Sequence, residues 1–80
     1  MTDTEQRLTA LVAALSHEAI SDRDLDTPLF GLGLDSLQLI KLAVSVEDEF
    51  ACAVPADGVR ERMSIRKFAA WLDRNMAVRA

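Results

Sequence analysis

The sequence predicts an all-α fold: a small helical bundle of three longer helices and one short helix, with a long loop between the first two helices. Apolar residues recur at three- and four-residue spacings in three separate stretches. The three glycines and two prolines all lie outside those stretches. Half of the residues are hydrophobic, which is enough to form a core. Because a chain of 80 residues leaves no room for a second core, residues 1–80 are expected to form a single domain.

The first helix is expected from about Thr4 to His17, and it carries one apolar stripe. The members of this stripe are Leu8, Leu11, Val12 and Leu15. The last helix is expected to begin after Ser64 as N-cap and to end near Met76. A short turn of helix is expected from Asp57 to Arg62.

The second helix, expected from Ser36 to about Phe50, is apolar on two faces. The face predicted to pack inward contains Leu39, Leu42, Ala43, Val46 and Phe50. The other face contains Leu37, Ile40 and Val44. This second face is either a wide edge of the core stripe or a surface that contacts another molecule.

The connection from about Ala19 to Asp35 is long for so small a domain, which favours a functional loop. Its apolar residues are spaced so that they can pin the loop to the helices, and Gly31 and Gly33 permit backbone geometries that other residues resist. The pinning residues are expected to be Leu25, Leu29, Phe30, Leu32 and Leu34. Such a loop would hold the start of the second helix at a reproducible position.

Ser36 is the candidate functional residue, since it stands where this loop meets the second helix. The local sequence is Gly31-Leu32-Gly33-Leu34-Asp35-Ser36-Leu37. Asp35 and Ser36 are both good N-cap types, and the N–H groups and partial positive charge of a helix N-terminus favour a phosphate. A hydroxyl there is well placed to carry a phosphodiester-linked group. The alternative is that Ser36 only caps the helix.

The run from Asp26 to Leu37, together with residues 47–50, 54–55 and 63–65, resembles the acyl carrier protein family along nearly the whole chain. The resemblance implies that Ser36, with Asp35 in an Asp-Ser-Leu motif, receives phosphopantetheine from coenzyme A. It also implies that the second helix contacts partner enzymes, here through Leu37, Ile40 and Val44. The implied partners are a phosphopantetheinyl transferase and enzymes that load or process an acyl or aminoacyl group.

The chain differs from fatty-acid-type carriers, which tend to be acidic just after the motif and around the short third helix. Here those places hold Gln38 and Lys41, and Arg60 and Arg62. We therefore expect a discrete acyl carrier of a specialised pathway, in polyketide, fatty-acid-like or related biosynthesis. One alternative is a peptidyl or aminoacyl carrier of a nonribosomal peptide pathway. The other is a small helical interaction module, or a helix-turn-helix DNA binder, with no covalent cofactor.

Charge and composition argue against several other functions. Residues 1–59 carry three Lys/Arg and eleven Asp/Glu, whereas residues 60–80 carry six and two, and this acidic balance argues against nucleic acid as a partner. Cys52 is the only cysteine and is expected to be buried or half-buried, without a disulfide or metal. His17 is the only histidine, and Ser36 lacks a Gly-x-Ser-x-Gly elbow, so no catalytic residue is expected. We expect a cytoplasmic monomer with no membrane partner.

Overall fold

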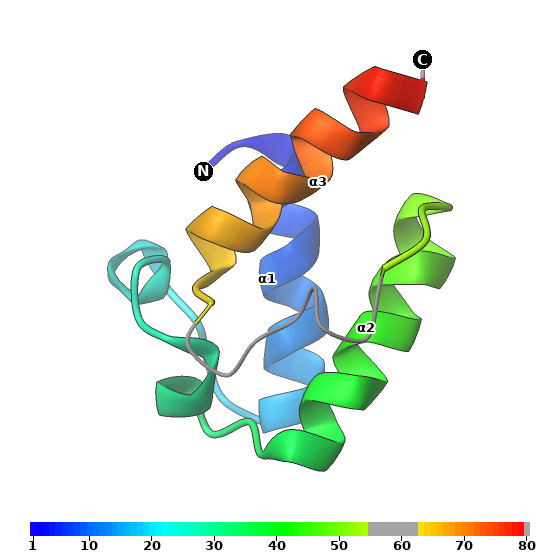
Figure 1. Ribbon diagram of the computed structural model, residues 1–80. Helices are drawn as coiled ribbons and strands as arrows, with labels where there is room; N and C mark the ends of the chain where they lie inside the picture. Colours follow the sequence, from blue (N-terminus) through cyan, green and yellow to red (C-terminus); the bar gives the residue numbers. More distant parts are fainter. Residues whose placement is uncertain (55–62, 80) are drawn as a thin grey trace.

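The structure is a computed structural model that describes residues 1–54 and 63–79 (Figure 1). It contains the helices α1 (Asp3–Ser16), α2 (Ser36–Phe50) and α3 (Ile65–Arg79). Two short 3₁₀ helices, η1 (Asp22–Asp24) and η2 (Leu29–Leu32), lie in the connection between α1 and α2. The predicted all-α fold with three longer helices is confirmed. The short helix expected over Asp57–Arg62 lies outside the described residues.

The helix ends follow from local capping. The Thr2 hydroxyl accepts from the Glu5 N–H at 3.1 Å, and the Glu5 carboxylate accepts from the Thr2 N–H at 2.8 Å, so α1 begins one residue earlier than expected. It ends where exposed His17 adopts a left-handed backbone conformation. The Ser64 hydroxyl accepts from the Lys67 N–H at 3.2 Å, which confirms the predicted N-cap of α3.

The last helix continues to Arg79 rather than ending near Met76. No glycine or proline follows Pro55 and Gly58 in the sequence, so nothing in the backbone chemistry of this segment stops the helix.

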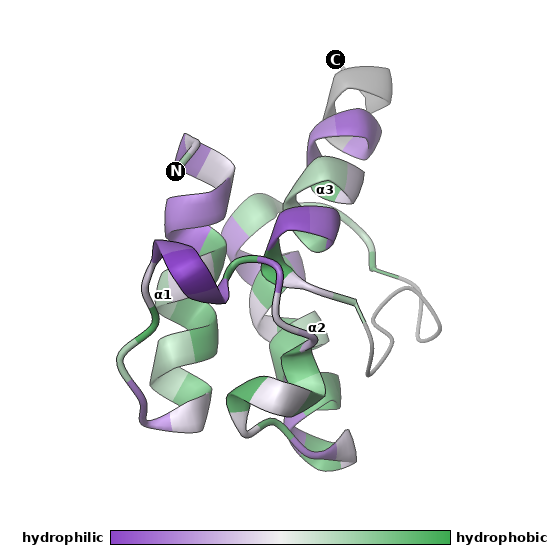
Figure 2. Ribbon diagram, turned by 90° about the vertical axis from the view of Figure 1, so that its left-hand side faces the viewer, coloured by the Kyte–Doolittle hydropathy of each residue, from purple (hydrophilic) through white to green (hydrophobic). Residues whose placement is uncertain are grey.

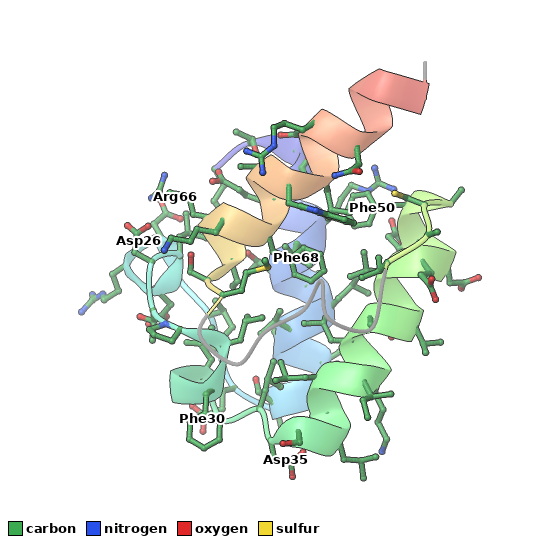
Figure 3. All side chains as sticks on the ribbon, in the orientation of Figure 1. Asp26, Phe30, Asp35, Phe50, Arg66 and Phe68 are labelled. Carbon is green, nitrogen blue, oxygen red and sulfur yellow. The ribbon has the colours of Figure 1, made fainter. Side chains whose placement is uncertain are left out.

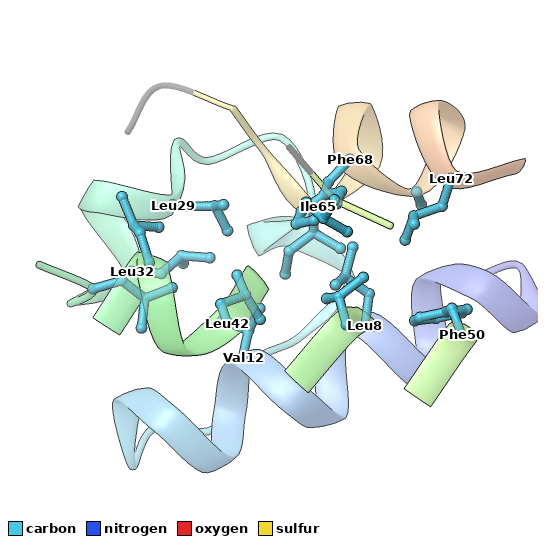
Figure 4. Packing of buried hydrophobic residues seen from close by; sticks show 14 of the residues in the cluster. Leu8, Val12, Leu29, Leu32, Leu42, Phe50, Ile65, Phe68 and Leu72 are labelled. Carbon is cyan, nitrogen blue, oxygen red and sulfur yellow. The ribbon is translucent and has the colours of Figure 1, made fainter. Parts of the chain in front are cut away.

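One continuous core joins the three helices, and α1 packs against both α2 and α3 (Figure 4). Leu8 and Val12 of the predicted α1 stripe are fully buried, while Leu11 and Leu15 are partly buried. The inward face predicted for α2 is also confirmed, with Ala43 partly buried and its other four members buried. The buried residues from α3 are Ile65, Phe68, Ala69 and Leu72. Cys52 is buried, as expected from the sequence.

The connection between α1 and α2 is part of this core. Its four leucines, Leu25, Leu29, Leu32 and Leu34, are all buried, as predicted. The backbone also fastens the connection to the start of α3, because the Leu29 N–H donates to the Met63 carbonyl and the Arg66 N–H donates to the Leu25 carbonyl, each at 3.0 Å. The Arg66 side chain adds a bond to Asp26 at 2.7 Å (Figure 3).

Phe30 does not pin the loop, and that prediction was wrong: its side chain is 58% exposed. The reason is the 3₁₀ geometry of η2, in which residues three apart eclipse each other. Leu29 and Leu32 therefore share the inward side, and Phe30, one position after Leu29, faces away from the core.

The C-terminal end of α2 is held by Arg7 of α1. Its guanidinium lies over the Phe50 ring, 4.3 Å from the centroid, and donates to both the carboxylate and the backbone carbonyl of Glu49 at 3.0 Å. A cation near the C-terminus of a helix is favourable for the helix dipole. Arg7 thus links α1 to the last turn of α2, in addition to the buried contacts that Phe50 makes.

Val46 and Val44 give a matched test of which face of α2 is buried, since Val46 is fully buried and Val44 is 60% exposed. We expect Val46→Ala to lower the free energy of unfolding by about 2 kcal/mol, because it removes two buried methyl groups and leaves a cavity. Val44→Ala should change it by less than about 0.5 kcal/mol. Chemical denaturation of both variants checks this; equal losses would contradict the described orientation of α2.

Candidate functional site

Ser36 is the first residue of α2 and is exposed, while Asp35 before it is the N-cap. The Asp35 carboxylate accepts from the Gln38 N–H at 2.8 Å, and the Gln38 side-chain oxygen accepts from the Asp35 N–H at 3.1 Å. Of the two cap candidates in the sequence, the structure therefore selects Asp35. Ser36 is thus the first helical residue rather than the N-cap.

Gln38 is a residue of the site that the sequence analysis did not predict. It bonds both to the N-cap of α2 and to the end of α1. Besides closing the cap, its side-chain amide donates to the Leu15 carbonyl in the last turn of α1 at 3.1 Å. The spacing Asp-x-x-Gln before an apolar helical stretch resembles a capping box, and this signal could have identified the first of these bonds. The bond to Leu15 depends on how α1 and α2 pack.

The approach to Ser36 is fixed by Gly33 and its neighbours. Gly33 has φ of 89°, a left-handed conformation that a side chain would strain, and its N–H donates to the Phe30 carbonyl at 3.3 Å. The buried leucines at positions 32 and 34 stand on either side of it. Gly31 serves a different purpose from the one predicted: a Cβ there would lie 3.1 Å from the Thr27 methyl carbon, so space rather than backbone conformation favours glycine.

The electrostatics around Ser36 suit an anion. The helix dipole places partial positive charge at the start of α2, and the Asp35 carboxylate already accepts from the Gln38 N–H there. Between Leu29 and Val44 the charged residues are Asp35 and Lys41, which balance each other. A phosphate attached at the start of α2 would lie in this field.

The second apolar face of α2 is exposed, with Leu37, Ile40 and Val44 at 60%, 63% and 60%. The interpretation of these residues as a wide core stripe is therefore wrong. Hydropathy colours show the contrast between hydrophilic η1 and largely apolar α2 (Figure 2). The exposed face begins beside Ser36 and extends along α2.

Within residues 1–54 and 63–79, no cluster of His, Cys, Asp or Glu side chains could hold a metal ion. In the same described ranges, no helix is both long and apolar enough to span a membrane.

A family model described as "Phosphopantetheine attachment site" matches residues 6–72 of the chain. The chain belongs to this family. It is a carrier rather than an enzyme, and its cofactor is a covalently attached phosphopantetheine. Membership implies that a phosphopantetheinyl transferase and acyl-handling enzymes act on the carrier.

Two relatives support the carrier assignment. The carrier is 29% identical over 80 residues to an acyl carrier protein of Zymomonas mobilis, a match that covers 96% of this chain and 100% of that protein. It is also 32% identical over 68 residues to a non-reducing polyketide synthase of Aspergillus terreus, covering 85% of this chain but 2% of the synthase. The family resemblance inferred from the motif is thus confirmed.

Asp35 can be tested as the helix cap independently of any cofactor. We expect Asp35→Ala to lower the free energy of unfolding by about 1 kcal/mol, because the Gln38 N–H loses its acceptor. Asp35→Asn should stay within a few tenths of wild type, since asparagine caps as well as aspartate. Denaturation curves of both variants distinguish the cap from the charge: an Asn variant as unstable as the Ala variant would contradict the capping role.

Proposed function

We propose that Ser36 carries the phosphopantetheine group. The observation that supports this most is its exposure at the start of α2, outside the cap bonds of Asp35. The other four serines are less suited. Ser64 is buried as a cap, Ser16 and Ser45 are half-buried, and Ser21 precedes only the three-residue 3₁₀ helix η1 rather than an α-helix.

The carrier contributes two things to this modification: a nucleophilic hydroxyl and the partial positive charge of a helix N-terminus. The Ser36 Oγ forms a bond to phosphorus as a P–O bond in the pyrophosphate of coenzyme A breaks. Adenosine bisphosphate leaves, and the hydroxyl proton passes to a base of the transferase. The N-terminus of α2 favours the negative phosphodiester that results.

When attached, the cofactor supplies a thiol at the end of a flexible arm, and this thiol holds the cargo as a thioester. The carrier keeps the cargo near its partners, and tethering raises its effective concentration at each active site. The rigid connection before Ser36 gives the arm a fixed origin.

We propose that the exposed α2 face of Leu37, Ile40 and Val44 is the surface that partner enzymes contact. Its three side chains follow Ser36 by one, four and eight positions, so an enzyme at the serine can cover all of them. Desolvation of such apolar side chains is what stabilises the centre of an interface.

We further propose that the carrier is a discrete acyl carrier in polyketide or related biosynthesis. Support comes from its match to the whole length of an acyl carrier protein and from its similarity to a polyketide synthase segment. A nonribosomal peptide carrier is the alternative, and identifying the group that an activating enzyme loads would decide between them. The expected cytoplasmic location, monomeric state and single domain over residues 1–80 remain predictions. The interaction module without a cofactor is not retained, because the family carries one.

The attachment site is tested by intact mass after incubation with coenzyme A and a broad-specificity phosphopantetheinyl transferase. Wild type should gain the mass of one phosphopantetheine group. Ser36→Ala should fold normally and gain nothing, whereas Ser21→Ala, which removes the other exposed serine, should be modified like wild type. Modification that persists in Ser36→Ala would assign the cofactor to another residue.

The contact face is tested by Ile40→Asp, with Ala10→Asp as a control at an exposed position of α1. Both should shift stability by about 0.5 kcal/mol or less. Only Ile40→Asp should slow modification or loading, by about tenfold or more, because a carboxylate must be desolvated where an apolar contact forms. Circular dichroism and rate are measured on the same samples; unchanged rates for Ile40→Asp would contradict the contact face.

A further inference from the structure

Phe30 is exposed in η2, shortly before Ser36 in the sequence, although an aromatic side chain gains free energy from burial. In the part of the chain that the structure describes, the large exposed hydrophobic residues are Met1, Phe30, Leu37, Ile40 and Val44. Four of these five lie within eight positions of Ser36 along the chain, Phe30 before it and the other three after it. Phe30 and Asp35 lie at the same end of the molecule (Figure 3).

The outward direction of Phe30 is built into η2. Leu29 and Leu32 are buried on its inward side, and the Leu29 N–H is bonded to the Met63 carbonyl. The Gly31 N–H donates to Pro28 at 2.8 Å and closes the turn. Turning Phe30 inward would therefore withdraw two leucines from the core. An aromatic side chain held in water by its own backbone is a preorganised contact, since little further ordering is needed on binding.

Chain geometry places Phe30 close to Ser36. The Gly33 N–H bond to the Phe30 carbonyl makes Phe30–Gly33 one full 3₁₀ turn, which rises about 6 Å. The three steps from Gly33 to Ser36 span at most about 11 Å, so the Cα atoms of Phe30 and Ser36 are no more than about 17 Å apart. A standard interface covers about 800 Å² of each partner, a disc of roughly 16 Å radius. An interface of this size centred on Ser36 therefore extends to about the position of Phe30.

We propose that Phe30 is a contact residue for the phosphopantetheinyl transferase, whose matching surface is an apolar pocket on the loop side of Ser36. The proposal rests on Ser36 as the attachment site. The transferase is the partner that must bring its active site within bonding distance of the Ser36 Oγ. Enzymes that act on the thiol meet it at the far end of a long arm, so they are under no such constraint.

The scarcity of charged residues around Phe30 and Ser36 in the sequence supports an apolar surface on the partner. The stretch from Leu29 to Val44 carries one acid and one base, Asp35 and Lys41, and the acid is bonded within the cap. Ion pairs between this stretch and a charged partner are therefore few, and added salt has little to screen within it. Contact at Phe30 and along α2 then depends on desolvation of apolar side chains.

The test is steady-state kinetics of the transferase, with the apo carrier as the varied substrate. Phe30→Ala should raise KM for the carrier about tenfold while kcat stays unchanged, because the contact is lost equally from the ground and transition states. Phe30→Trp should stay near wild type. Gln6→Ala is the control: Gln6 is exposed in the first turns of α1, and α1 begins at the opposite end of the molecule from the start of α2 (Figure 1). Wild-type KM should change less than about twofold between roughly 0.05 and 0.5 M salt.

An unchanged KM in Phe30→Ala would overturn the role of Phe30 and leave Ser36 as the attachment site, because wild type would still gain mass. A raised KM together with lost helicity would assign Phe30 to the fold and overturn the contact. A KM that rises steeply with salt would overturn the apolar character of the interface. A wild-type chain that gains no mass would overturn both proposals.

Discussion

The burial of four leucines in the connection between α1 and α2 is the constraint on which the rest of the structure depends. Each buried leucine contributes about 1.5–3 kcal/mol, in a domain class whose total stability is about 5–15 kcal/mol. The connection is thus part of the hydrophobic core rather than a surface loop. Its buried members are Leu25, Leu29, Leu32 and Leu34. Since Ser36 follows directly, hydrophobic packing fixes the position of the residue that we propose as the origin of the cofactor arm.

Much of the fold could be predicted because its determinants are local. The α1 stripe and the inward face of α2 follow from helical periodicity, and Ser64 caps α3 because its hydroxyl can reach the N–H of Lys67. Phe30 could not be placed in this way. Whether an apolar residue of a loop is buried depends on the local backbone conformation, which sets how many residues separate side chains on the same side. The spacing of apolar residues in the loop did not reveal that residues 29–32 form a 3₁₀ helix, in which side chains three apart share a side.

At the candidate site, the sequence predicted Ser36 as the functional residue but left open whether Ser36 or Asp35 caps the helix. Helix boundaries are uncertain by a residue or two from sequence, and here that single residue decides whether the serine is needed as a cap. The second α2 face was also left open, since only packing could show that Leu37, Ile40 and Val44 lie outside the core. Contacts across the fold, such as Arg7 on Glu49 and Arg66 on Asp26, join residues about forty positions apart and have no local signal.

Gln38 couples the two helices that meet at the site. Its side-chain oxygen completes the cap of α2, and its amide group bonds to a carbonyl at the end of α1. Fraying of the first turn of α2 would break the bond to α1 as well, so opening of the two helix ends is coupled through this bond. Backbone amides at both ends should then exchange with solvent at linked rates, although twenty residues of sequence separate them. The proposed attachment site thus lies at a helix end that is stabilised by a bond to another helix.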